Sequence, residues 1–176
     1  KRIHTPGSIY PWFISGAKGK IVWVEQLPDP RWENRDYSVI KILDIKHSKV
    51  IQLSRRSRYL SASLSPDGRF IAAAENTIDN KNSLIIIDAF NGDILKTVSM
   101  PANNYPQRPC WSGTGENITL ISLSSGGEGV LSWSVKDEKW DTLIEPAGDD
   151  LQSTFLRNDS LFFVSSSSGT DNIWLL

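Results

Sequence analysis

The sequence of 176 residues predicts an all-β fold made of repeated four-stranded β-propeller blades. Three observations lead to this prediction. A short turn motif recurs along the chain, and a run of Ile, Leu and Val that ends in a polar turn recurs in phase with it. No apolar pattern of helical period persists for the length of a helix. Repeats of about 40 to 50 residues with four strands each are typical of propeller blades.

The turn motif marks the same point in each repeat. Its clearest copy is Ser65–Ala72, and Ser112–Thr119, Ser15–Val22 and, more weakly, Arg157–Phe163 resemble it. The anchor residues of the four copies are separated by 49, 47 and 44 residues. They are Gly19, Gly68, Gly115 and Asp159. Because the apolar runs keep the same phase, a chance similarity is a poor explanation.

The second repeat shows where the strands of one blade fall. Pro66 presets φ for a turn, Asp67-Gly68 offers the positive φ of a tight hairpin, and Asn91-Gly92 repeats that signal later. The four expected strands are Ser61–Leu64, Phe70–Glu75, Leu84–Asp88 and Ile94–Val98. A β-sandwich is the alternative fold. It would explain the strands and turns, but not the phased repeat.

Extended to the whole chain, the repeat predicts one domain over residues 1–176. The expected blades cover about 9–53, 59–98, 107–144 and 151–176. Ile173–Leu176 aligns with Ile85–Asp88, so the last blade lacks its fourth strand. We therefore expect about three and a half blades, and a longer chain whose remaining blades complete the propeller. Alternatively, Arg2–Thr5 supplies the missing strand and closes a small ring.

Two segments resemble the WD-like repeats of TolB-type β-propellers. They are Leu64–Ala72 and Ser168–Leu176. The resemblance implies that the first is the hairpin of the inner strands and that the second leads into a third strand. It also implies a location in the bacterial periplasm or at the cell surface. Gly113-Thr114-Gly115 in place of Pro-Asp-Gly, and the long insertion Leu27–Tyr37, depart from the pattern.

Composition excludes several classes of partner. The net charge of −1 creates no global field for nucleic acid or an anionic membrane, so we expect no nucleic-acid partner. No apolar stretch is long enough to cross a bilayer, so we expect no membrane insertion. Cys110 is the single cysteine and can form neither an intrachain disulfide nor a thiolate zinc site alone. We expect neither a metal nor a cofactor.

The sequence offers little for catalysis. Its two histidines are His4 and His47, and His47 lies in a polar turn. Neither a His-Glu-x-x-His zinc motif nor a Gly-x-Ser-x-Gly nucleophile elbow is present. Gly126–Gly129 lacks the lysine of a phosphate loop and reads as a hairpin turn. We therefore expect no enzyme activity within this segment.

The candidate partner-binding face comes from propeller geometry. Loops that join the second strand to the third, and one blade to the next, emerge on one face. The candidate residues there are Arg31, Trp32, Arg55, Arg56, Arg58, Tyr59 and Tyr105. Arginine and the aromatic residues are typical of binding hot spots. There are two alternatives to a binding role. Arg55–Tyr59 would be an ordinary solvated connector, and Trp32 would pack beneath its own loop.

Three functions follow as hypotheses. The first is a non-catalytic module for protein–protein interaction or scaffolding, with an unknown protein partner. The second, from the resemblance, is an accessory propeller of a peptidase or other hydrolase whose catalytic domain lies outside this segment. The third is a carbohydrate-binding module with Trp32 and Tyr37 as its aromatic platform.

Overall fold

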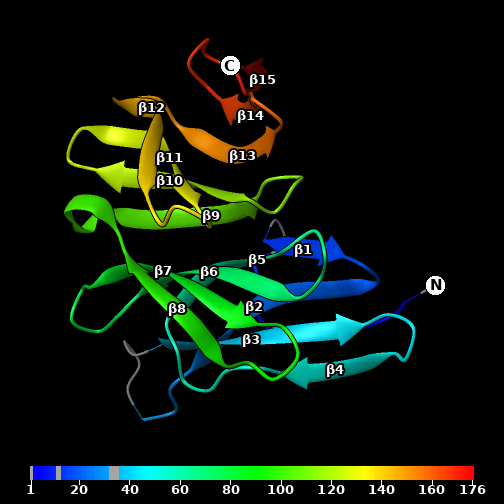
Figure 1. The fold of residues 1–176 in the computed structure, drawn as a ribbon. Helices are drawn as coiled ribbons and strands as arrows, with labels where there is room; N and C mark the ends of the chain where they lie inside the picture. Colours follow the sequence, from blue (N-terminus) through cyan, green and yellow to red (C-terminus); the bar gives the residue numbers. More distant parts are fainter. Residues whose placement is uncertain (1, 11–12, 32–35) are drawn as a thin grey trace.

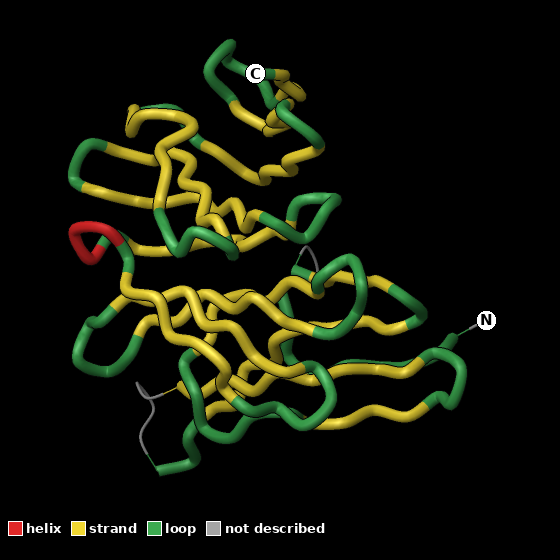
Figure 2. The backbone as a smooth tube through the Cα atoms, viewed as in Figure 1, coloured by secondary structure: helices red, strands yellow, loops and turns green. Residues whose placement is uncertain are grey.

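A computed structural model of the chain describes residues 2–10, 13–31 and 36–176. The described residues form four antiparallel sheets and a single short 3₁₀ turn, η1 (Pro101–Asn103), drawn red in Figure 2. The sheets follow one another from blue to red in Figure 1. The predicted fold class, three four-stranded blades and a fourth that is incomplete, is confirmed.

Each sheet takes its strands in chain order, so every connection within a sheet is a hairpin. Sheet 1 contains β1 (Ile14–Ala17), β2 (Lys20–Pro28), β3 (Asp36–Asp44) and β4 (Lys49–Gln52). Sheet 2 contains β5 (Tyr59–Leu64), β6 (Phe70–Asn76), β7 (Asn82–Asp88) and β8 (Ile94–Ser99). Sheet 3 contains β9 (Tyr105–Trp111), β10 (Asn117–Ser124), β11 (Gly127–Ser134) and β12 (Trp140–Ala147). Sheet 4 contains β13 (Leu151–Arg157), β14 (Ser160–Ser165) and β15 (Asn172–Leu175).

The four expected strands of the second repeat agree with sheet 2 to within two residues at each end. The insertion Leu27–Tyr37 is shorter than predicted, because β2 continues through Pro28 and β3 begins at Asp36. The pairing of the two strands extends to Pro28 and Asp36. The glycine-rich stretch is a tight hairpin between β10 and β11, as expected.

The recurring turn motif closes the first hairpin of each sheet. Gly68 and Gly115 adopt left-handed conformations with φ of 72° and 77°, which glycine tolerates without strain. In sheet 2 the Ser65 hydroxyl accepts from the Phe70 N–H at 2.9 Å. In sheet 4 the left-handed residue is Asn158, with φ of 53°, one position before the sequence anchor Asp159. Asparagine can replace glycine there because it tolerates this conformation.

Neighbouring sheets pack face to face through alternating apolar side chains. Val22 and Ile40 of sheet 1 meet Ile85 of sheet 2 in one buried cluster. The other face of sheet 2 meets sheet 3 in a second cluster, and a third joins sheets 3 and 4. Fully burying one such Val, Leu or Ile side chain contributes about 1.5 to 3 kcal/mol. The stack of sheets is therefore held by one apolar layer per interface.

Sheet 4 has three strands in this structure. Beyond β15, Leu176 exchanges two backbone hydrogen bonds of 2.9 Å with Leu161. Ring closure by Arg2–Thr5 is not adopted. Within that segment the His4 ring stacks on Trp23 of β2, with centroids 5.4 Å apart, so the segment lies against sheet 1. The described residues contain no helix long and apolar enough to span a lipid bilayer.

Candidate functional site: the central channel and its mouth

The innermost strands of all four sheets surround one cavity of about 740 Å³, here called the channel pocket. These strands are β1, β5, β9 and β13, the first of each sheet. Because every sheet runs outward in chain order, its first strand faces the centre of the stack. The lining residues are Phe13–Ser15, Ser61–Ser63, Arg108–Cys110, Asp150 and Gln152–Thr154.

Arg108 is aimed by a β-bulge. Cys110 pairs with Thr119 and Gln107 pairs with Ile121, so two residues of β9 oppose one of β10. The backbone of Arg108 takes a left-handed φ of 49° at this point. A bulge bends its strand and redirects a side chain. Here it turns the one arginine of β9 toward the channel pocket.

Arg108 then contacts sheets 2 and 4 and the segment just before β1. Its backbone N–H donates to the Ser61 hydroxyl at 3.1 Å. Its Nη1 donates to the backbone carbonyl of Gln152. Its guanidinium lies 5.3 Å from the ring centroid of Phe13, just before β1. Nε of Arg108 is buried and has no hydrogen-bond partner among the described residues. Buried donors without a protein partner are rare in native proteins, where ordered water often supplies the missing bond.

A second pocket, of about 270 Å³, adjoins the channel pocket and shares Phe13, Ser61 and Arg108 with it. We call it the mouth pocket. Its other lining residues are Tyr10, Gln26, Leu60, Tyr105 and Gln107. The Tyr10 and Phe13 rings are tilted by 58°, with their centroids 5.7 Å apart. Phe13 and Arg108 therefore lie where the two pockets meet.

Burial shifts the pKa values of two side chains that line these pockets. Burial raises the pKa of Tyr105, and the nearby positive charge of Arg58 partly opposes that rise. Burial likewise raises the pKa of the Cys110 thiol to about 11, so the thiol stays protonated near neutral pH. A protonated thiol is a weak nucleophile. The pocket offers hydroxyls, amides and one guanidinium, a set suited to hydrogen bonding.

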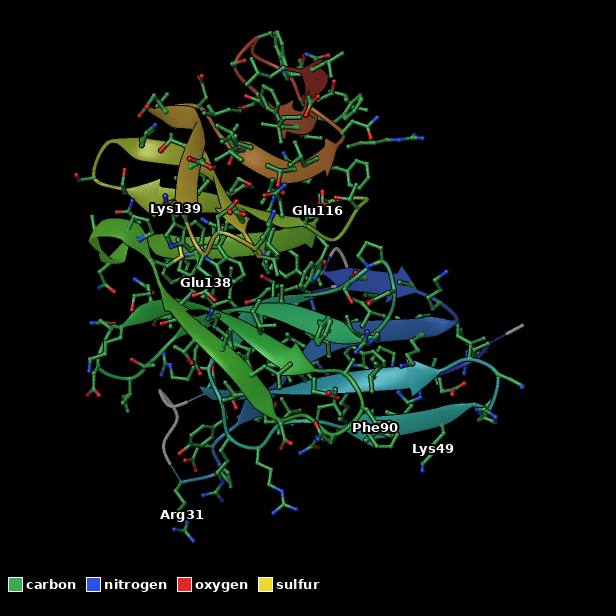
Figure 3. All side chains as sticks on the ribbon, in the orientation of Figure 1. Arg31, Lys49, Phe90, Glu116, Glu138 and Lys139 are labelled. Carbon is green, nitrogen blue, oxygen red and sulfur yellow. The ribbon has the colours of Figure 1, made fainter. Side chains whose placement is uncertain are left out.

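Three of the predicted partner-face residues are exposed. Arg31 follows β2, has its N–H bonded to Asp29 Oδ1 at 2.9 Å, and points away from the body of the molecule (Figure 3). Arg55 is exposed in the connector from sheet 1 to sheet 2. Arg56 is exposed beside it, with its guanidinium 5.7 Å from the Tyr37 ring centroid. Trp32 lies outside the described residues.

Two others are half-buried, and one is in the core. Arg58 donates from Nε to the Asn76 carbonyl at 3.1 Å, and Tyr105 lines the mouth pocket. Tyr59 is only 3% exposed and belongs to the cluster between sheets 1 and 2. The prediction that its side chain lies on an exposed face is wrong. The connector ends one residue earlier than expected, and β5 turns Tyr59 inward.

The predicted residues form two groups rather than one. Arg56, Arg58 and Tyr37 border a shallow pocket of about 240 Å³ together with Glu75, whose pKa is raised by burial. Arg58 also stands near Tyr105 of the mouth pocket. The Arg56 guanidinium lies over the ring of Tyr37, one of the two aromatic residues of the carbohydrate hypothesis.

Sequence reasoning missed Arg108, Tyr10 and Phe13. The prediction looked for binding residues in the loops alone. It did not consider the first strand of each repeat, although that strand faces the channel. The available signal was an arginine between Pro106 and Pro109, in a strand whose counterparts in the first two repeats, β1 and β5, carry no charged residue. An arginine at an inward position is costly unless it is paired.

His47, which the sequence places in a polar turn, pairs with a nearby aspartate. His47 Nδ1 lies 2.8 Å from Asp44 Oδ2 in an exposed turn, and this hydrogen bond lowers the pKa of Asp44. The bond caps the turn. In the described part of the chain, no three His, Cys, Asp or Glu side chains are grouped to hold a metal ion.

Solved structures share this fold. TolB from Acinetobacter baumannii matches with a TM-score of 0.67 at 18% identity, over 89% of this chain and 38% of that one. A hydrazine synthase from Kuenenia stuttgartiensis matches with a TM-score of 0.66 at 12% identity, over 98% of this chain and 47% of that one.

A puromycin-hydrolyzing peptidase from Mycobacterium tuberculosis matches with a TM-score of 0.60 at 15% identity, over 93% of this chain and 36% of that one. The chain thus spans less than half the length of each of these three structures. No protein-family model and no curated protein matches the sequence. The shared feature is the fold of TolB-type propeller blades.

Proposed function

We propose that the chain is a non-catalytic propeller module that binds a protein partner at the mouth of its central channel, for interaction or scaffolding. The observation that carries this proposal is that Tyr105 and Arg108 line the mouth pocket together, with the positive charge of Arg58 close to Tyr105. Tyrosine and arginine dominate binding hot spots because they combine apolar area with hydrogen-bond donors. A peptide segment that reaches the channel would meet serine hydroxyls and the Arg108 guanidinium.

The test uses random peptides displayed on phage and selected on the wild-type chain. Affinities of the selected synthetic peptides are then measured for Arg58→Gln and Tyr105→Ser. Each substitution should weaken binding about tenfold or more, the effect of losing a hot-spot side chain. Lys139→Gln is the control, because Lys139 is exposed in the β11–β12 turn of sheet 3 (Figure 3). Equal affinities of the peptides for the wild type and all three variants would refute the site.

The second candidate function is an accessory propeller of a peptidase. The similarity to the Mycobacterium tuberculosis peptidase favours it, together with the 36% of that longer chain that this one covers. On this proposal, further blades and a hydrolase domain belong to the same parent chain. Sequencing the gene on both sides of this segment separates the candidates. Flanks that encode only further blades would remove the peptidase.

We also propose a periplasmic or cell-surface location, which the resemblance to TolB supports. Fractionation of the source cells, with the chain detected by antibody, tests this location. Recovery with the cytoplasmic fraction would refute it.

A further inference from the structure

Two copies of the turn motif, in sheets 2 and 3, each lie against the sheet before them. Gly68 and Gly115 hold the same position in these two copies, with φ of 72° and 77°. A Cβ on Gly68 would lie 3.1 Å from the Cβ of Lys18 in sheet 1. Among the described residues, a Cβ on Gly115 would meet within 4 Å only the Cδ of Pro66, at 3.7 Å. The contact between sheets 2 and 3 is therefore looser at this point than the contact between sheets 1 and 2.

A lysine completes the tighter of these two contacts. Lys20, at the start of β2, donates from Nζ to the carbonyl of Gly68 at 3.0 Å. Arg69 holds the place of Lys20 in the motif of sheet 2. Its guanidinium instead lies 5.3 Å from the ring centroid of Phe70. In the described part of the chain, the carbonyl of Gly115 therefore has no cation bonded to it.

A cavity of about 290 Å³, here called the turn pocket, lies between the turn motifs of sheets 2 and 3. Its apolar wall comes from both sheets and consists of Pro66, Phe70, Ile86, Trp111 and Val135. Trp111 is buried, whereas Val135 is 37% exposed and lies at the rim. The turn pocket is at the far end of β9 from the mouth pocket, because Trp111 ends this strand and Tyr105 begins it.

The carboxylate of Asp67 also lines the turn pocket. Its Oδ1 accepts from the Ser65 hydroxyl at 2.6 Å and from the Arg69 N–H at 3.0 Å. The hydrogen bond from Ser65 lowers the pKa of Asp67 below its ordinary value, so the group is charged near neutral pH. Among the described residues, no donor is bonded to Oδ2 of Asp67. This second oxygen is therefore available to a cation that enters the pocket.

A lysine side chain matches the turn pocket in both shape and charge. Lysine packs its methylene stem along apolar surface and keeps its ammonium group at the edge. The ammonium group has three donors, enough to reach Oδ2 of Asp67 and the carbonyl of Gly115 together. A glutamate side chain would be repelled by Asp67, and a purely apolar side chain would leave both acceptors unmet. Lys20 already makes the corresponding bond to Gly68 within this molecule.

We propose that the turn pocket binds a lysine side chain of a partner protein, in the way that Lys20 occupies the contact between sheets 1 and 2. The apolar wall of the pocket holds the stem, and Asp67 with the carbonyl of Gly115 binds the ammonium group. The turn pocket is separate from the channel mouth, and its residues differ from those of the mouth pocket. The proposal therefore stands or falls independently of binding at the mouth.

The experiment titrates the chain with the peptide acetyl-Gly-Gly-Lys-Gly-Gly-amide and follows backbone amide shifts by NMR. The amide signals of Asp67 and Gly115 should move as the peptide is added. A second peptide with norleucine in place of lysine keeps an apolar stem but lacks the ammonium group. It should bind about threefold more weakly, the effect of losing one exposed ion pair. A third peptide with glutamate in place of lysine should move neither signal.

Two variants locate the binding site within the turn pocket. Asp67→Asn removes the charge and keeps an Oδ1 acceptor for Ser65, so it should weaken binding of the lysine peptide about threefold and leave binding of the norleucine peptide unchanged. Val135→Trp should abolish binding of both peptides, because the larger side chain fills the rim. Asp141→Asn is the matched control, since it removes the same charge from an exposed carboxyl in β12, outside the pocket.

Three outcomes would overturn the proposal. One is that the lysine peptide leaves the amide signals of Asp67 and Gly115 in place. Another is equal affinity for the lysine and norleucine peptides, since the pocket would then take an apolar side chain instead. The third is equal affinity of the lysine peptide for the wild type and for Asp67→Asn. A well-dispersed amide spectrum of Asp67→Asn shows that this variant is folded.

Discussion

The indole Nε1 of Trp111 donates a hydrogen bond of 3.1 Å to the backbone carbonyl of Ser63. The bond joins β9 to β5, the inner strands of sheets 3 and 2. Trp111 is 5% exposed, so both partners are shielded from water. One side chain therefore contributes to the apolar layer and to a polar link between two sheets.

Trp111→Phe should keep most of the apolar contact and lose this link. We expect the free energy of unfolding to fall by about 1 to 3 kcal/mol, because a buried carbonyl loses its partner. Urea denaturation measures the change. Trp140→Phe is the control, since its indole donates to the Ser99 carbonyl at 3.2 Å in an exposed setting. Equal losses for the two variants would show that burial of the bond is unimportant.

Gly92→Ala should strongly destabilise the contact between sheets 1 and 2. Gly92 has a φ of 82°, and a Cβ at this position would lie 2.3 Å from the Leu53 carbonyl oxygen. We expect a loss of about 2 to 3 kcal/mol from the steric clash and the strained backbone. Gly113→Ala should have little effect, because no atom lies within 4 Å of its Cβ position. Thermal denaturation of both variants checks the difference, and similar melting temperatures would contradict it.

Arg108→Lys should loosen sheet 4 although the charge is kept. A lysine cannot reproduce the planar contact with Phe13 together with the bond to the Gln152 carbonyl. We expect faster amide hydrogen exchange in β13, and unchanged exchange in β6. Mass spectrometry of the exchanged peptides measures both strands. Arg55→Lys, at an exposed position, should change neither strand; a matching effect there would rule out a specific role for Arg108.

Stability should decline in acid through Glu25. Burial alone would raise the pKa of this carboxyl, but hydrogen bonds from Lys41, Gly7 and Trp23 outweigh burial and lower it. Because the folded pKa lies below the ordinary value of 4.5, the contribution of Glu25 is complete above 4.5 and is lost as the pH falls through the folded pKa.

Urea denaturation across this pH range measures that loss. Glu25→Gln should be less stable than the wild type near neutral pH and should lose less stability in acid. Asp67→Asn removes another carboxyl with a lowered pKa, at an exposed turn, and serves as the comparison. Parallel pH curves for the wild type and Glu25→Gln would contradict this role.

The repeat made the strands predictable, because Gly68 and the apolar runs around it report local conformation directly. Tyr59 shows where local reasoning failed. The residues before it, Arg55–Arg58, are polar, yet the first residue of β5 faces the core. Arg108 shows a second failure, since its role comes from contacts with Phe13, Ser61 and Gln152, which lie far away in sequence. Only a folded stack of sheets brings those residues together.

The packing of the sheets also sets how the molecule opens. Among the described residues, sheets 2 and 3 each pack against a sheet on both sides, and sheet 4 packs against sheet 3. In stacked repeats, stability is close to a sum of the units and their nearest-neighbour interfaces. Within this segment, opening of sheet 4 therefore requires the loss of its interface with sheet 3.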